Sequence, residues 1–216
     1  MRFLAHLLLF CILTLCVPNV RASTIKRTTQ IFTTVDGLPD NSINDIQKDQ
    51  EGYLWIATNK GLSRFDGKSF VSFSKANLNG FFADDVVNEI VIDQDKIYLL
   101  SKKKGIKILD RIKLQLTTFT NLPVLNLSVK KDQQLILFES GKCSLYKNLQ
   151  LKTNAFFGNY LARKAVFFDN KIYILTENKG VIETDTKQLK INKIIPAEYI
   201  YMYGNLMISD KLGLVY

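Results

Sequence analysis

Short apolar runs alternate with turns rich in glycine and aspartate along most of the chain. Between Gly37 and Phe70 the runs are separated by the turns DQEG, TNKG and DG. Such turns favour β-hairpins, because glycine accepts the positive φ that a tight turn requires. No stretch has the pattern of a helix longer than a turn or two. The pattern predicts strands over Ile43–Lys48, Tyr53–Ala57, Leu62–Phe65 and Ser69–Phe73.

This arrangement of runs and turns repeats along the chain. The turn glycines Gly61, Gly105, Gly141 and Gly180 follow one another at spacings of 44, 36 and 39 residues. The spacing is close to the period of roughly 40–50 residues that is typical of propeller blades. The sequence SINDIQKDQEGYLWI aligns without a gap on VVNEIVIDQDKIYLL, and KIYIL nearly copies KIYLL. The third repeat fits less well.

The second run of each repeat (YLWIA, IYLLS, LILFE and IYILT) is apolar on both faces. A strand of this kind is buried from both sides, and sheets with two apolar faces are stable only when stacked against one another. We therefore predict an all-β fold, a β-propeller of four-stranded blades with four blades and part of a fifth, as an incomplete part of a larger ring. Trp55 is predicted to lie in the core between blades.

The predicted organisation is a signal peptide over residues 1–22 and a propeller domain over residues 23–216. The blades are expected at residues 37–78, 79–120, 121–157 and 158–195, with a partial blade at 196–216. An additional strand is expected over Thr28–Thr34. This strand could complete the last sheet and close a five-bladed ring.

The first residues have the layout of a secretory signal. Arg2 precedes the apolar run Leu7–Val17, Pro18 follows, and Ala22 ends a Val-Arg-Ala cleavage pattern. A membrane-spanning helix needs about 20 mainly apolar residues, whereas Phe3–Val17 has 15. We expect cleavage after Ala22 and a periplasmic location, with membrane anchoring only through a longer parent chain.

Cleavage would remove His6, Cys11 and Cys16, and would leave Cys143 as the single cysteine of a chain without histidine. Such a chain has no intramolecular disulfide, no imidazole-based catalysis and no Cys/His metal cluster. The acidic pair Asp84-Asp85 lacks the ligand spacing of a calcium loop. We therefore predict no catalytic residue, no metal and no cofactor, and a buried, unreactive Cys143.

The net charge is +9, but the charge pattern does not favour a nucleic-acid site. The lysines are scattered among the turns, and Lys102–Lys104 is the one run. Lysines in turns are normally solvated and protect exposed strand edges from pairing with other chains. We predict that this segment binds no nucleic acid.

The segment GLPDNSINDIQKDQEGYLWIATNKGLSRFDGKSF, Gly37 to Phe70, resembles the two-component regulator propeller repeat. The shared features are a Gly-Leu-Pro linker, an Asn-Ser-Ile start, the run Asp-x-x-Gly-x-Leu-Trp-Ile-x-Thr and a closing Phe-Asp. The other repeats depart from this form, since the alignment places Leu99, Leu137 and Ile174 at the position of Trp55.

The resemblance implies an extracytoplasmic, ligand-sensing propeller of a signal-transduction regulator and not an enzyme. It implies that the ligand is an oligosaccharide or another small molecule. The implied partners are further C-terminal blades and a transmembrane kinase or DNA-binding output domain of a parent chain, of which this sequence would be an N-terminal fragment. A homodimer is left open. The alternatives are a self-contained, secreted five-bladed binding or scaffold propeller and, less favoured, a glycan-active enzyme.

The linker before the first blade holds the candidate ligand-binding residues Asp40, Asn41 and Ser42. Linkers at this point of a propeller approach its central channel, where these side chains could hydrogen-bond to a sugar. The alternative is turn capping, because short Asx and Ser side chains bond to nearby backbone groups. An aspartate also recurs at the end of the third strand, which predicts a turn role for Asp66, Asp110 and Asp185.

Overall fold

The structure, a computed structural model, describes residues 29–216 except residues 83, 169, 178, 197–200, 204–205, 210–213 and 216. The chain divides into two compact units, Met1–Ile31 and Phe32–Tyr216. The predicted signal peptide, residues 1–22, lies outside the described residues. In the part of the chain that is described, no helix is long and apolar enough to cross a membrane. The helical elements there are the 3-10 turns η1 (Thr34–Asp36) and η2 (Gly158–Tyr160).

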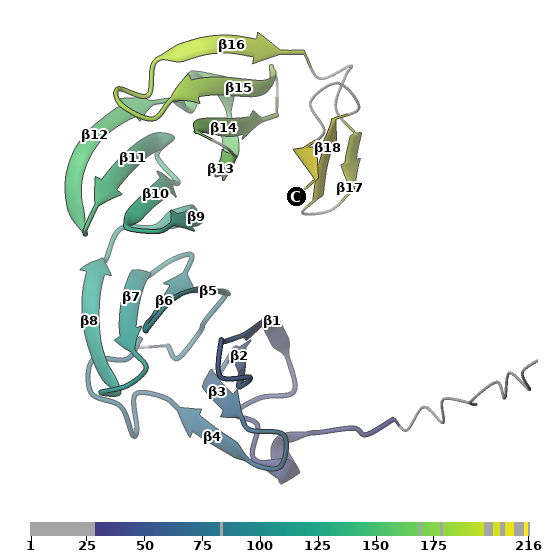
Figure 1. Ribbon diagram of the computed structural model, residues 1–216. Helices are drawn as coiled ribbons and strands as arrows, with labels where there is room; N and C mark the ends of the chain where they lie inside the picture. Colours follow the sequence, from purple (N-terminus) through teal and green to yellow (C-terminus); the bar gives the residue numbers. More distant parts are fainter. Residues whose placement is uncertain are drawn as a thin grey trace, which may run out of the picture. The chain divides into compact units, whose positions relative to one another are not determined.

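Four antiparallel sheets of four strands follow one another within Phe32–Tyr216, and each has its strands in sequence order (Figure 1). The first blade is β1 (Ile43–Lys48), β2 (Leu54–Thr58), β3 (Gly61–Phe65) and β4 (Phe70–Phe73). The second is β5 (Glu89–Asp93), β6 (Lys96–Ser101), β7 (Gly105–Asp110) and β8 (Gln115–Thr120). The third is β9 (Val124–Lys130), β10 (Gln133–Phe138), β11 (Lys142–Lys147) and β12 (Gln150–Phe156). The fourth is β13 (Ala162–Phe168), β14 (Lys171–Thr176), β15 (Gly180–Asp185) and β16 (Ile191–Ile195).

A smaller sheet of three strands follows the fourth blade in sequence. Its strands are β17 (Tyr201–Tyr203), β18 (Leu206–Ser209) and β19 (Leu214–Val215). The predicted fold class is therefore confirmed: the chain is all-β, with four propeller blades and three strands of a further one.

The prediction of a strand over Thr28–Thr34 is wrong for the residues of this range that the structure describes. Residues 29–33 form no strand, and Thr34 begins η1. The physical reason is a capping box, in which the backbone N–H of Thr33 donates to the Asp36 carboxylate at 2.7 Å while the Thr33 hydroxyl caps the turn. The ring of Phe32 instead packs on Phe65, with 4.9 Å between the ring centroids. This segment therefore does not supply the strand that would close a five-bladed ring.

Each pair of neighbouring blades encloses an apolar core of its own. Between the first and second blades, Trp55 packs with Leu62 and Phe73 against Ile97 and Leu99. Trp55 is 1% exposed, and its ring stacks on Phe73 with 5.9 Å between centroids. The prediction that Trp55 belongs to the core between blades is confirmed. The next two cores are formed around Tyr98, Leu100, Val124 and Ile136, and around Leu135, Cys143, Phe167 and Ile174.

The alignment that places Leu99 and Ile174 at the position of Trp55 is one residue out of register. Trp55 faces the following blade, whereas Leu99 and Ile174 face the preceding one. The residues on the equivalent face are Tyr98 and Tyr173. The turn between the second and third strands has two residues in the first blade and three in the second and fourth. Aligning on the turn glycine therefore shifts the strand by one residue and reverses its faces.

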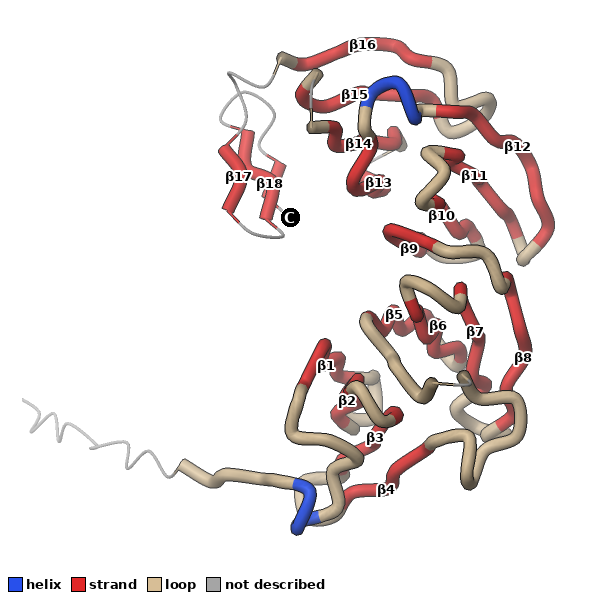
Figure 2. The backbone as a smooth tube through the Cα atoms, turned by 180° about the vertical axis from the view of Figure 1, so that it is seen from behind, coloured by secondary structure: helices blue, strands red, loops and turns tan. Residues whose placement is uncertain are grey.

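The first strands β1, β5, β9 and β13 lie on the inner side of the blades in both views (Figures 1 and 2). Contacts join β1 to β5, β5 to β9 and β9 to β13. These strands belong to different sheets, so the hydrogen-bonding groups on their inner edges need partners other than a neighbouring strand. This requirement shapes the site described below.

Candidate ligand-binding site at the first strands

A recess of about 510 Å³ lies where the first strands of the four blades meet. In each blade, one residue of the first strand lies opposite the second-to-last residue of the second strand and lines the recess. The side chains at this position are Asp45, Glu89, Asn126 and Lys164. One position of the repeat therefore presents four different polar groups to one recess.

The preceding residue of each strand also lines the recess. These residues are Asn44, Asn88, Leu125 and Arg163. Strand side chains normally alternate between faces, but the pairing of the first strand shifts at Asn44, Leu125 and Arg163. A β-bulge of this kind places an extra residue in the strand and redirects its side chain. The bulges explain how two consecutive residues can line one recess.

Two of the four equivalent side chains hold neighbouring blades together. An Asp45 carboxylate oxygen accepts the backbone N–H of Ile90 at 2.8 Å, and the Asn126 amide oxygen accepts that of Ala165 at 2.9 Å. Ile90 and Ala165 are 1% and 0% exposed, so these donors would otherwise be buried without a partner. The roles of Asp45 and Asn126 are thus explained by the fold.

The other two equivalent side chains have no such role. Within the described part of the chain, the side chains of Glu89 and Lys164 make no hydrogen bond and no ion pair within 4.0 Å. Burial raises the pKa of the Glu89 carboxyl, and the nearby Asp45 adds to this effect, while Lys164 and Lys102 oppose it. Glu89 and Lys164 are therefore polar groups that face the recess and are not used by the fold.

The recess combines donors and acceptors of both charges. Gln47 and Lys102 add an amide and an ammonium group to its lining. Arg163 is oriented by Glu177, whose carboxylate accepts its Nε–H at 2.6 Å. No group of three or more His, Cys, Asp or Glu residues among those described could hold a metal ion. The arrangement is suited to a polar ligand held by several hydrogen bonds.

The predicted site residues Asp40, Asn41 and Ser42 are not among those that line this recess. An Asp40 carboxylate oxygen accepts the backbone N–H of Ser42 at 2.7 Å, and the Asn41 side-chain oxygen accepts that of Thr34 at 2.9 Å. Asp40 also pairs with Lys60 at 3.5 Å. These are capping contacts within the linker, and ligand binding by the three residues stays a prediction.

The aspartates at the ends of the third strands have the turn role that their recurrence predicts. Asp66, Asp110 and Asp185 each accept the backbone N–H groups two and three residues later. These donors lower the pKa of each carboxyl, because they stabilise its ionised form. The three residues close turns and do not line the recess.

Comparison with known proteins agrees with the resemblance found in the first repeat. The family model "Two component regulator propeller" matches residues 37–60. A curated relative, "Histidine kinase P4" of Formosa agariphila, is 49% identical over 39 residues, which are 18% of this chain and 3% of that protein.

Two solved structures are similar over most of the chain. One is described as the extracellular domain of a hybrid two component system of B. thetaiotaomicron, with a TM-score of 0.63, 17% identity, and coverage of 87% of this chain and 31% of that one. The other is PorZ, a surface component of the type-IX secretion system of Porphyromonas gingivalis, with a TM-score of 0.62, 19% identity, and coverage of 83% and 26%.

The chain spans 31% and 26% of the lengths of these two structures, and at this level of identity the likeness shows the fold. The family match lies within the blade that has the Gly-Leu-Pro linker and Trp55. Residues 37–60 at the start of the first blade therefore match the two-component regulator propeller repeat, and the chain is a β-propeller similar to extracellular domains of hybrid two-component systems.

Proposed function

We propose that this chain is the ligand-sensing propeller of an extracytoplasmic signalling protein, and that it binds an oligosaccharide in the recess between the first strands. The periplasm is the proposed location. The proposed partner is an output domain, a kinase or a DNA-binding domain, on a longer parent chain. The similarity to extracellular domains of two-component systems supports this assignment.

The observation that carries the proposal is the different use of one repeated position. Asp45 and Asn126 bond to the next blade, whereas the side chains of Glu89 and Lys164 make no hydrogen bond and no ion pair within 4.0 Å in the described structure. A polar group that is partly buried without a partner is unfavourable for folding. Such a group is expected where a ligand supplies the missing contact.

The chemistry of the recess favours a ligand with many hydroxyl groups. Lys164 and Lys102 can only donate hydrogen bonds, an ionised Glu89 can only accept them, and the amides of Gln47 and Asn88 can do both. A sugar hydroxyl both donates and accepts, so one class of ligand satisfies all of these groups. The volume of about 510 Å³ lies within the range of ligand pockets of roughly 300–1,000 Å³.

The test is titration calorimetry of the full chain with a panel of xylo-, malto- and galacturono-oligosaccharides. We expect at least one series to bind and Lys164→Gln to weaken that binding by about tenfold, which corresponds to ~1.4 kcal/mol. Lys103→Gln is the matched control, because Lys103 is an exposed turn residue outside the lining of the recess. An absence of binding to the whole panel, or equal affinities for the two lysine variants, would overturn the proposal.

A further inference from the structure

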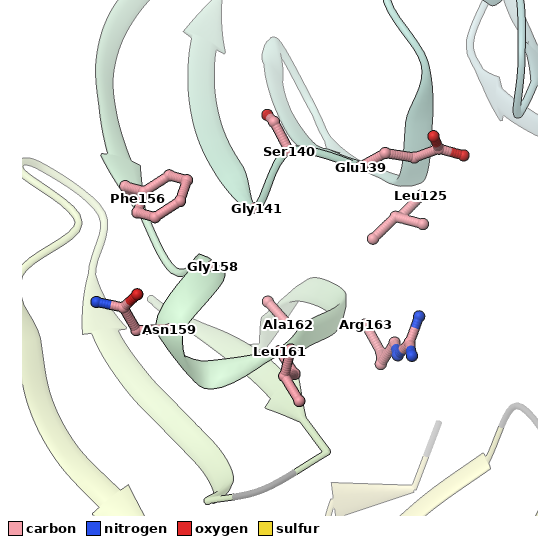
Figure 3. Close-up of a pocket in the computed structure, with 10 residues that line it drawn as sticks. All are labelled: Leu125, Glu139, Ser140, Gly141, Phe156, Gly158, Asn159, Leu161, Ala162 and Arg163. Carbon is pink, nitrogen blue, oxygen red and sulfur yellow. The ribbon is translucent and has the colours of Figure 1, made fainter.

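A second recess, of about 600 Å³, lies between the third and fourth blades. Its lining includes Phe156 at the end of β12, η2 and the start of β13 (Figure 3). Leu125 and Arg163 line this recess as well as the one between the first strands. The two recesses therefore adjoin at these residues.

The second recess presents an aromatic ring to solvent. Phe156 is 62% exposed, and its ring contacts no other aromatic ring among the described residues. A Cβ atom at Gly158 would come 2.8 Å from Cε1 of Phe156, so the ring lies directly against the backbone of this glycine. The backbone of Gly158 in turn abuts Gly141, where an added Cβ would lie 2.7 Å from the Gly158 nitrogen. The outer edge of the ring thus abuts Gly158, and much of the Phe156 side chain is exposed.

Leu161 adds a second exposed apolar group to the same recess. It is 50% exposed and adopts a left-handed backbone conformation with φ 48° and ψ 55°. Leu161 is the C-cap of η2, a position at which the left-handed conformation is common. The fold buries only part of Leu161, and the side chain contributes an apolar group to the lining of the recess.

The polar end of the recess is held in place by an ion pair. Arg163 donates from Nε to the Glu177 carboxylate at 2.6 Å, and its Nη2 group pairs with the same oxygen. The Nη1 donors have no such bond in the described structure. In Figure 3, Phe156 and Arg163 lie toward opposite ends of the labelled residues, with Gly141 and Gly158 between them.

We infer that the recess at Phe156 is a second binding subsite, which takes the apolar face of one sugar ring while an adjoining sugar occupies the recess between the first strands. The inference rests on the proposed function and deepens it, because it assigns the ligand a length of at least two rings. The C–H face of a sugar packs on an aromatic ring, and its hydroxyls remain free to bond to Arg163. A single sugar would not reach both subsites.

The test is a length series, from monosaccharide to hexasaccharide, of the oligosaccharide that binds in the panel. We expect the affinity of the full chain to rise about tenfold, or ~1.4 kcal/mol, once the ligand is long enough to reach Phe156. Phe156→Ala is expected to remove this rise and leave the affinity for the shortest binding sugar unchanged. Phe156→Leu, which keeps an apolar side chain, is expected to remove most of it.

Leu151→Ala is the matched control, because Leu151 is on the same strand, is 49% exposed and does not line the recess. Equal melting temperatures of the three variants would show that folding is unchanged. A length dependence that persists in Phe156→Ala would overturn the inference. A flat length series with binding that still depends on Lys164 would overturn the second subsite alone, whereas no binding by any sugar would overturn the proposed function as well.

Discussion

The indole nitrogen of Trp55 donates a 2.8 Å hydrogen bond to the carboxylate of Asp49, and both residues are buried, at 1% and 6% exposure. The other oxygen of Asp49 accepts the backbone N–H groups of Glu51 and Tyr53 at 3.1 and 2.9 Å. The carboxylate therefore links the turn after β1 to the core between the first two blades. This contact explains why the aspartate, the glycine turn and the tryptophan occur together in the first repeat.

Asp49→Ala is expected to lower the free energy of unfolding by about 2–3 kcal/mol, because it leaves three donors without their acceptor. Urea denaturation of the full chain measures the change. Asp132→Ala is the control, since Asp132 is a turn residue whose side chain is 42% exposed and whose ion pair with Lys147 spans 3.6 Å, and exposed pairs contribute roughly 0–1 kcal/mol. Equal losses in the two variants would contradict the role given to Asp49.

Arg111 connects the first two blades electrostatically. Its guanidinium pairs with Glu51 of the first blade and, at 2.9 Å, with Asp95 of the second, and its Nε–H donates to the Gln94 carbonyl. The two carboxylates are well exposed, whereas the Arg111 side chain is 9% exposed, and we expect Arg111→Ala to lower the free energy of unfolding by about 1 kcal/mol. This loss is expected to shrink in high salt, since ions screen exposed charges.

Urea denaturation at low and high sodium chloride concentrations measures the Arg111 effect. Lys142→Ala, an exposed lysine of β11, controls for the general effect of removing a positive charge. A loss in Arg111→Ala that is the same at every salt concentration would show that its contribution is packing and not ion pairing.

The Cys143 thiol is expected to be inert in the folded chain. Its side chain is 0% exposed, and burial raises the pKa of the thiol to about 12. The thiolate is the reactive form, so a buried thiol with such a pKa reacts only when the structure opens. Labelling with a thiol reagent at pH 8 is expected to be slow in buffer and fast in denaturant. Rapid labelling in buffer would contradict the placement of Cys143 in the core.

The fold was predictable because its signals are local. The strands predicted between Ile43 and Phe73 agree with β1 to β4 within a residue at either end, since turn residues act over a few positions. The face of each strand was less predictable. The turn after β6 has one residue more than the turn after β2, so Tyr98, and not Leu99, occupies the position equivalent to Trp55. A difference of this kind is not visible in the apolar pattern.

The recess was not predicted, for a different physical reason. Alignment of the repeats places Asp45 over Glu89, but it does not show which of the two has a hydrogen-bond partner. That difference arises from the contact of Asp45 with the next blade. Asp40 and Asn41 are candidates from the sequence because linkers at this point of a propeller approach its central channel, and the structure shows that they make the local capping contacts of the alternative interpretation.

The placement of Glu89 in the ligand recess predicts a pH-dependent contribution of this residue to the free energy of unfolding. Burial raises the pKa of its carboxyl above the ordinary value, so the folded chain binds this proton more tightly than the unfolded chain does. The destabilisation that comes from burying the ionised Glu89 carboxylate is therefore absent below the pKa of the unfolded state. It grows as the pH rises between the two pKa values and is complete above that of the folded state.

Glu89→Gln removes the charge and keeps the shape of the side chain. The most direct measurement is therefore the free energy of unfolding and the oligosaccharide affinity of this variant, at pH 4 and pH 7. We predict that the variant is more stable than the wild type at pH 7, that this gain disappears at pH 4, and that its affinity at pH 7 falls about tenfold. A variant that is less stable at pH 7, or that binds as tightly as the wild type, would contradict the assignment of the recess as the ligand site.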